Sequence, residues 1–189
     1  MNAIDLLRNR SSAVSASVIG ALGELADVDL ATPILPGTSP LGLTLWHVAR
    51  TQDWLVQASI RGVPEVAERF RGGLPDPDRY GFGTGLSAEA AITAAREIRP
   101  DRLAAYATAV GEEVDRWLST LRDVDLDAVP PFDERQMSRA AYSTPAALAE
   151  VAGLGGLTAG QLLLRPAMSP VFRHLGEVDV LGQLARRGR

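Results

Sequence analysis

Two residue types that carry much of protein chemistry are missing from this chain of 189 residues. It contains no cysteine, which excludes disulfides, thiolate metal clusters and a cysteine nucleophile. Any thiol chemistry would therefore need a thiol brought by a substrate or a cofactor. It also contains no lysine, because all nineteen basic residues are arginine. Schiff-base formation and phosphate-loop binding by a lysine are thus excluded.

Positive charge and long apolar runs are also limited. Acidic residues outnumber basic ones by 23 to 19, and no basic stripe alternates with aromatic residues, which argues against a nucleic-acid partner. The stretch "MNAIDLLRNRSSAVSASV" lacks the pattern of a secretory leader. The uncharged run 151–164 is shorter than the roughly 20 apolar residues that span a bilayer. We therefore expect a cytoplasmic protein that binds neither nucleic acid nor membrane.

Hydrophobic residues make up 46% of the chain, enough to fill one core, and their spacing is helical throughout. Hydrophobic residues recur at spacings of three and four in four segments: before "DVDLATPILPGTSP", in residues 43–61, in 103–121 and in 171–185. No period-two strand pattern or internal repeat is present. We predict one all-α domain over residues 1–189, a four-helix bundle with long crossover connections and a frayed tail at 185–189. The apolar stripe predicted within 103–121 consists of Leu103, Tyr106, Ala107, Val110, Val114, Trp117 and Leu121.

Capping residues, prolines and glycines mark the connections. Ser87 is placed to cap one helix, and Pro100 is placed to begin the next, because its ring suits a first turn. Residues 62–86 are loop-like around "GGLPDPDRYGFGTG", with one short helix at "PEVAERF". No strand precedes these glycines, so we interpret the segment as a mobile loop near the mouth of a site and not as a nucleotide loop. Residues 123–145 form a second long polar connection.

Two prolines interrupt the helical pattern near the C-terminus. Pro166 and Pro170 each lack the amide hydrogen that an unbroken helix uses, so we predict that the last helix is kinked or divided between them. Ser169 is placed to cap a new helix with Pro170 at its first position.

Only two histidines are present, His47 and His174, and each lies in a predicted helix. In "LTLWHVARTQDW", His47 shares one helical stripe with Thr51 and Trp54, so it faces inward. In "VFRHLGEVDVLGQL", Glu177 follows His174 by three residues, so both can face the bundle. We predict that the two imidazoles meet in the folded core and form, with Glu177, a site for a small molecule in the bundle cavity.

Each candidate residue also has a structural interpretation. An isolated inward histidine such as His47 is typical of a core side chain hydrogen-bonded to a neighbour. Glu177 and Asp179 are typical of solvated surface carboxylates, and Asp179 points away from the predicted site. Trp54 and Trp117 are typical of core anchors, because aromatics at helical spacing normally fill bundles. The sequence leaves these alternatives open.

The motifs "LWHVARTQDW" and "LLLRPAMSPVFRHLGEVDVL" resemble the DinB superfamily of metal-dependent helical bundles, which includes the bacterial mycothiol and bacillithiol S-transferases and the N-terminal domains of mycothiol-dependent maleylpyruvate isomerases. The resemblance covers most of the chain as helix order and loop lengths. It implies a divalent metal, Zn²⁺ or Ni²⁺, that activates a low-molecular-weight thiol for attack on an electrophile. The arginine-only composition indicates a GC-rich bacterial source, and mycothiol is the thiol expected of an actinobacterium.

The resemblance also implies positions for the metal ligands. In the family, one histidine of the second helix and two of the last helix hold the metal; the latter two are four residues apart and are followed by a glycine and a glutamine. His47 matches the first ligand, His174 the last and Gly176 the glycine, while Glu177 stands where glutamine is usual. Pro170 occupies the middle position and carries no donor. Two histidines alone would hold metal weakly, because a catalytic zinc ordinarily keeps three protein ligands.

Two kinds of function follow from these residues. The first is an enzyme that acts on a small molecule. It is either a thiol S-transferase with an altered metal site, in which Glu177 supplies an oxygen ligand or orients His174, or a metal-free descendant that uses His47, His174 and Glu177 for acid–base chemistry. The second is a non-catalytic small-ligand binder or stress-related pseudoenzyme on the same bundle. A homodimer is compatible with either.

Overall fold

The computed structural model of the chain describes residues 2–164 and 169–187. Within these ranges every regular element is a helix and no strand occurs, which confirms the predicted all-α class. None of the helices in the described ranges is long and apolar enough to cross a membrane.

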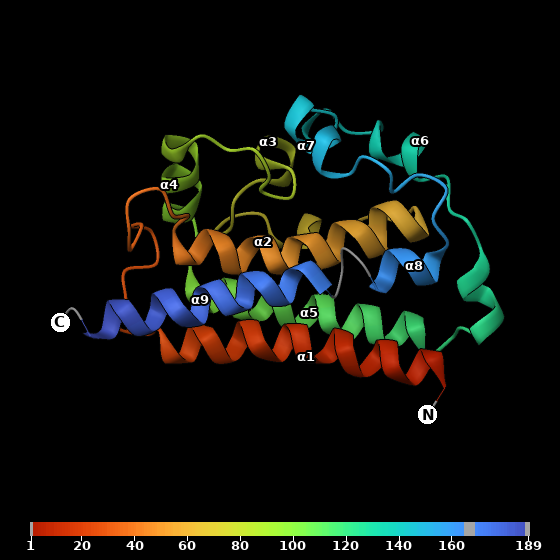
Figure 1. Cartoon of the computed structure of the whole chain (residues 1–189), viewed down its shortest axis with the longest axis horizontal. Coiled ribbons are helices and arrows are strands. Elements are labelled where there is room, and N and C mark those ends of the chain that lie inside the picture. Colours follow the sequence, from red (N-terminus) through yellow and green to blue (C-terminus); the bar gives the residue numbers. More distant parts are fainter. Residues whose placement is uncertain (1, 165–168, 188–189) are drawn as a thin grey trace.

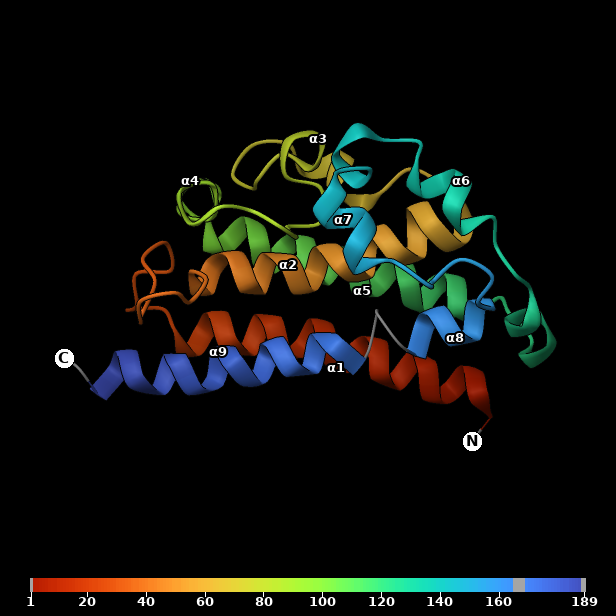
Figure 2. The ribbon, with the colours of Figure 1, turned by 45° about the horizontal axis from the view of Figure 1, so that its top comes forward.

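Four long helices lie alongside one another (Figures 1 and 2). α1 (Ala3–Glu24) and α9 (Ser169–Arg187) run in one direction, and α2 (Leu41–Asp53) and α5 (Pro100–Leu118) run in the opposite one. α2 continues directly into a π-helix, η1 (Trp54–Arg61), so the predicted helix 43–61 is present with a change of winding inside it. α1 packs on α5, and α2 packs on α5 and α9, so the main hydrophobic core lies between these four helices.

The sequence of α1 explains both its start and its buried face. Asn2 and Asp5 form a capping box: the Asn2 side chain accepts from the Asp5 amide at 2.8 Å, and the Asp5 carboxylate accepts from the Asn2 amide at 3.4 Å. Val14, Val18 and Leu22 form a stripe at spacings of four, and all three are buried. Full burial of a valine or leucine side chain contributes roughly 1.5–3 kcal/mol, so this stripe holds α1 to the core.

α5 begins at Pro100 as predicted, but it ends at Leu118, so Leu121 of the predicted stripe lies beyond the helix and is only partly buried. Its inner face differs at one further position. Trp117, expected in the buried stripe, is only half-buried, and the Arg61 guanidinium lies 5.7 Å from the centre of its ring. The buried row instead runs by fours from Val114 to Leu118, which is fully buried. This spacing places the tryptophan at the edge of the core.

Shorter helices occupy the two long connections and cover one side of α2 (Figure 1). The predicted helix at "PEVAERF" is present as a 3₁₀ helix. Ser87 caps the helix Ala88–Arg96, as predicted, by accepting from the Ala90 amide at 3.2 Å. Residues 123–145 are more structured than the predicted polar connection, since Phe132 and Tyr142 are buried there. The short elements are η2 (Val66–Phe70), α3 (Pro77–Tyr80), α4 (Ala88–Arg96), η3 (Asp123–Asp127), α6 (Phe132–Gln136), η4 (Ala140–Tyr142), α7 (Pro145–Glu150) and α8 (Ala159–Leu164).

In the last helical segment the structure describes two helices, α8 and α9, and Pro170 lies in the first turn of α9, as predicted. The predicted kink or break between Pro166 and Pro170 falls on residues 165–168, which lie outside the described part of the chain, as does the Ser169 side chain that was predicted to cap the new helix. At the other end, α9 extends to Arg187 and not only to 185 as predicted. Its last turn is basic, which suits the negative end of the helix dipole.

Candidate functional site

The structure brings the two histidines together, as the sequence predicted. His47 on α2 and His174 on α9 have ring centroids 5.0 Å apart, with the ring planes at 89°. Glu177, one turn after His174, places its Oε2 atom 2.9 Å from the Nδ1 atom of His174. The three predicted site residues therefore form one cluster where α2 packs on α9.

His47 is held in one tautomer and in one charge state. Its Nδ1 atom lies 2.5 Å from the carbonyl oxygen of Phe82, which can only accept, so Nδ1 carries the hydrogen and Nε2 presents a lone pair. Burial lowers the pKa of His47 to about 4; the bond to Phe82 opposes this shift, and the nearby His174 and Arg50 reinforce it. His47 is thus neutral near pH 7 and offers Nε2 as a hydrogen-bond acceptor.

His174 is oriented by a carboxylate. Its Nδ1–H donates to Glu177, which leaves Nε2 as the nitrogen that can exchange a proton with a ligand. When Nε2 takes up a proton, the carboxylate balances the charge of the ring. The side chains of His174 and Glu177 are 21% and 50% exposed, so solvent screens this coupling more than it would in a buried pair.

Both histidines line a pocket of about 270 Å³ between α2, the start of α9 and two loops. This volume is close to the lower end for small-ligand sites. Phe82, Val151 and Leu154 supply apolar wall, whereas Glu150 and Arg173 are exposed and carry opposite charges at the edge. The pocket can hold a small, mostly uncharged molecule against two imidazoles.

The loop that contributes Phe82 is fixed by close packing. The Phe82 ring stacks on Trp54, with centroids 4.3 Å apart and planes 24° from parallel. Gly83 has φ +90°, and a Cβ atom there would lie 3.0 Å from Trp46 and 3.4 Å from Nδ1 of His47. The segment that we interpreted as a loop near the mouth of a site does line the pocket, but it does so through buried contacts that the sequence did not indicate.

A buried ionic network behind this loop was missed by sequence reasoning. Arg50 is fully buried, with Nη1 3.3 Å from Asp53 Oδ2 and Nη2 3.4 Å from Glu65 Oε2; Nη2 also donates to the Tyr142 hydroxyl at 2.7 Å. Its Nε atom donates to the carbonyl oxygen of Gly81 at 3.3 Å, which ties the network to the loop. Burial raises the pKa of Asp53, and the guanidinium opposes that rise. A signal for two of these residues was present in the sequence, because Arg50 and Asp53 lie in α2, a helix without a solvated face.

The residues of this pocket do not make a complete metal site. Within residues 2–164 and 169–187, no group of three or more histidine, aspartate or glutamate side chains is placed to hold a metal ion. Pro170 lines the pocket beside both histidines at the position where a third imidazole was expected, and its ring offers no donor. Glu177 is engaged with Nδ1 of His174, away from the nitrogen that a metal would need.

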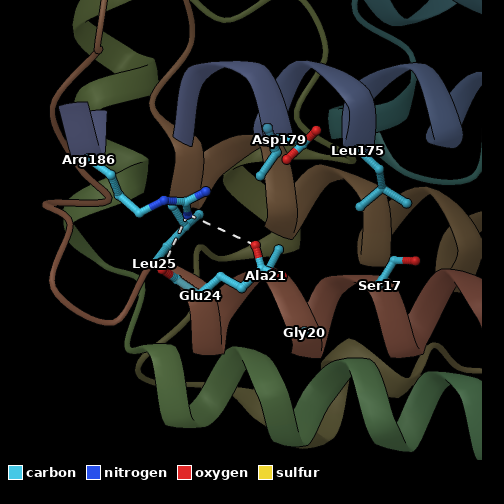
Figure 3. Close-up of a pocket in the computed structure, with 9 residues that line it drawn as sticks. Ser17, Gly20, Ala21, Glu24, Leu25, Leu175, Asp179 and Arg186 are labelled. Atoms are coloured by element: carbon cyan, nitrogen blue, oxygen red, sulfur yellow. Dashed lines mark hydrogen bonds and ion pairs between the residues drawn. The ribbon is translucent and has the colours of Figure 1, made fainter. Parts of the chain in front are cut away.

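A second hollow, of about 290 Å³, lies between α1 and the C-terminal half of α9 (Figure 3). Arg186 lines it and donates to the carbonyl oxygen of Glu24 at 3.4 Å. Asp179 also lines it and accepts from Gln183 at 3.1 Å. No histidine lines this hollow, so Asp179 is separate from the imidazole cluster, as its spacing predicted.

Comparisons with known proteins show a likeness of fold and leave the activity open. No family model matches the chain, and no curated protein matches it. A solved structure described as "Crystal structure of the conserved protein of locus from Enterococcus faecalis" superposes with a TM-score of 0.69 at 16% identity, over 100% of this chain and 99% of that one. The chain is thus similar in fold, along its whole length, to a bacterial helical protein.

Proposed function

We propose that this chain is a DinB-type four-helix bundle that acts on a small molecule by acid–base chemistry, without a tightly held metal. One observation carries the proposal: two imidazoles meet on a pocket wall, and each has its Nδ1 atom engaged elsewhere. The four long helices with their long connections, and the two motifs on α2 and α9, support the family assignment.

In this scheme the two histidines have different roles. Nε2 of His174 takes a proton from the ligand, and Glu177 balances the charge that develops on the ring. His47 stays neutral, because burial opposes a second cation beside the first, and its Nε2 accepts a hydrogen bond from the ligand. The proton returns from His174 to the product. A positioned base of this kind contributes roughly 10²–10⁴-fold to a rate.

A thiol such as mycothiol is one substrate that suits this scheme. A neutral imidazole can take the thiol proton and so produce the thiolate that attacks an electrophile. The chain has no cysteine that would compete with such a substrate.

Hydrolysis of 4-nitrophenyl acetate, a probe that responds to unprotonated imidazole, tests the proposal. We expect His174→Gln to lower the rate about 100-fold and Glu177→Gln to lower it about three- to tenfold, since the carboxylate is half exposed. Asp179→Asn, which makes the same chemical change on the same helix, should leave the rate unchanged. Excess EDTA should also have no effect.

Two results would overturn this function. Loss of the rate in EDTA would indicate a metal enzyme. A wild-type rate in His174→Gln would favour the second candidate, a small-ligand binder without catalysis, which is supported by the exposure of Glu177 and by the donorless residue Pro170.

A further inference from the structure

Two residues that line the histidine pocket each carry a buried polar atom without a hydrogen-bond partner among the residues that the structure describes. These atoms are Oγ1 of Thr51 and the indole Nε1 of Trp54. Thr51 is 8% exposed and Trp54 2% exposed, so bulk water does not reach them freely. Native proteins leave few buried polar groups without a partner, because each one destabilises the fold. Two such atoms on residues that line one pocket point to a ligand that satisfies them.

Thr51 differs from the other helical threonines in the described chain. Thr44, Thr93 and Thr108 each donate to the carbonyl oxygen four residues earlier, at 3.2, 2.9 and 3.0 Å. The equivalent bond from Thr51 would reach the carbonyl oxygen of His47, and it is not formed. Because this local acceptor is not used, the hydroxyl of Thr51 is left for another partner.

Trp54 restricts what that partner can be. Its indole Nε1–H is a donor only, so the group that it binds must be an acceptor. The ring is held in place by Phe82, which stacks on it, and by Phe132, whose centroid lies 6.0 Å away at 78°. The donor is therefore preorganised. It lies at the start of the π-helix η1, a type of local winding that is frequent at functional sites.

His47, Thr51 and Trp54 follow one another at spacings of four and three, so they lie in a row on one face of the helix. Thr51 and Trp54 are four and seven residues from His47, so a ligand oxygen held between them lies between one and two helical turns from His47, roughly 6 to 10 Å along the helix axis. His47 and His174 line the same pocket, so a ligand long enough to span this distance can reach both imidazoles. Binding at the two donors positions a ligand for the proposed chemistry.

The charge of the surroundings selects an uncharged oxygen. The charged residues that line the pocket, Glu150 and Arg173, are exposed at its edge and have opposite signs. The buried guanidinium of Arg50 is already matched by Asp53 and Glu65. A carboxylate held at the two neutral donors would lose its hydration without gaining a countercharge, whereas a neutral carbonyl would not carry that penalty.

We propose that this pocket binds a small molecule through an uncharged carbonyl oxygen that accepts from Nε1–H of Trp54 and from the hydroxyl of Thr51. Amides, esters, thioesters and ketones belong to this class. The apolar part of the ligand packs on Phe82, Val151 and Leu154. The inference rests on the proposed function in one respect only, namely that the histidine pocket is a ligand site.

Titration of ¹⁵N-labelled protein with benzamide, benzoate and toluene tests this inference. The chain has three tryptophans, so three indole N–H signals report on binding. We expect benzamide to shift the Trp54 signal, and to bind at least about tenfold more tightly than toluene or benzoate, a difference of about 1.4 kcal/mol. Equal affinity for toluene, tighter binding of benzoate, or no shift at Trp54 would overturn the inference.

Two variants test whether the indole of Trp54 and the hydroxyl of Thr51 donate to the ligand. Trp54→Phe and Thr51→Val should each weaken benzamide binding about tenfold and toluene binding by less than about twofold, because each removes one hydrogen bond and little apolar surface. Trp117→Phe, outside the pocket lining, is the matched control and should leave both affinities unchanged. If Trp54→Phe does not fold, the benzamide affinity of Thr51→Val tests the inference by itself, because valine nearly preserves the shape of the threonine side chain. Unchanged benzamide binding in Thr51→Val would overturn the role of the hydroxyl.

The inference and the proposed function fail in different ways. Binding of benzamide at Trp54 with a wild-type hydrolysis rate in His174→Gln would contradict the function and leave the inference standing. A reduced rate in His174→Gln, with no response of the Trp54 signal to benzamide, would contradict the inference alone.

Discussion

The carbonyl oxygen of Phe82 accepts a hydrogen bond from Nδ1 of His47 at 2.5 Å, across 35 positions of sequence. This bond couples the loop after α3 to the histidine pocket. It sets the tautomer of His47, and the surrounding loop provides part of the burial that keeps the ring neutral.

The first prediction concerns stability and pH. The pKa of His47 falls from 6.5 to about 4 on folding, so the unfolded chain binds more protons between these values. The contribution of neutral His47 is complete above about pH 6.5 and is lost as the pH falls toward 4, by roughly 3 kcal/mol in all. Urea unfolding of the wild type and of His47→Gln should be measured from pH 7.5 to 4.5. The free energy of unfolding of the wild type, relative to that of the variant, should decrease as the pH falls. A constant difference would contradict the neutral state of His47.

Gly83 provides a second prediction, because it lets the loop approach His47. Gly83→Ala should destabilise the protein by about 1–3 kcal/mol through a strained positive φ, and should also disturb the His47 environment, where the new Cβ would lie 3.4 Å from Nδ1. Gly37→Ala is the matched control, since Gly37 has φ +81° and nothing within 4 Å of its Cβ position. Urea unfolding and NMR titration of the two histidines measure both effects. Identical histidine titration curves in the two variants would show that crowding at Gly83 does not reach the site.

Helical spacing was sufficient to predict the central geometry of the site. The stripe of His47, Thr51 and Trp54 and the pairing of His174 with Glu177 both follow from positions three and four apart on a helix, because that spacing fixes a shared face. These contacts depend only on local winding and on one helix–helix packing.

Contacts made by the connections were not predictable in the same way. Phe82 reaches His47, and Glu65 reaches Arg50, only through the path of a long loop that no periodic pattern describes. Trp117 shows the limit for helices as well: a spacing of three or four identifies the apolar side, but small rotations of the helix decide which of Trp117 and Leu118 is fully buried.

A third prediction concerns the buried network. Arg50→Met should lower the free energy of unfolding by about 3–5 kcal/mol, because Asp53 and Glu65 would remain buried without their shared guanidinium. Arg71→Met is the control, since Arg71 pairs with Asp78 at 3.1 Å on an exposed surface, and its loss should cost no more than about 0.5 kcal/mol. Chemical denaturation of both variants measures the difference. A similar loss in the free energy of unfolding for the two variants would mean that the network is not a buried ionic centre.

The last prediction concerns the metal site that the family resemblance implies. Pro170 lies four residues before His174 on α9, and it lines the same pocket as His47, so a histidine at this position would complete a set of three imidazoles. We expect the wild type to bind Zn²⁺ or Ni²⁺ weakly and Pro170→His to bind it at least about tenfold more tightly, by about 1.4 kcal/mol. Calorimetric titration measures both affinities, and His47→Ala in the variant background should abolish the gain. Tight binding by the wild type would show that Glu177 or another group replaces the missing imidazole. An unchanged affinity in Pro170→His would show that the first turn of α9 does not direct position 170 toward the two histidines.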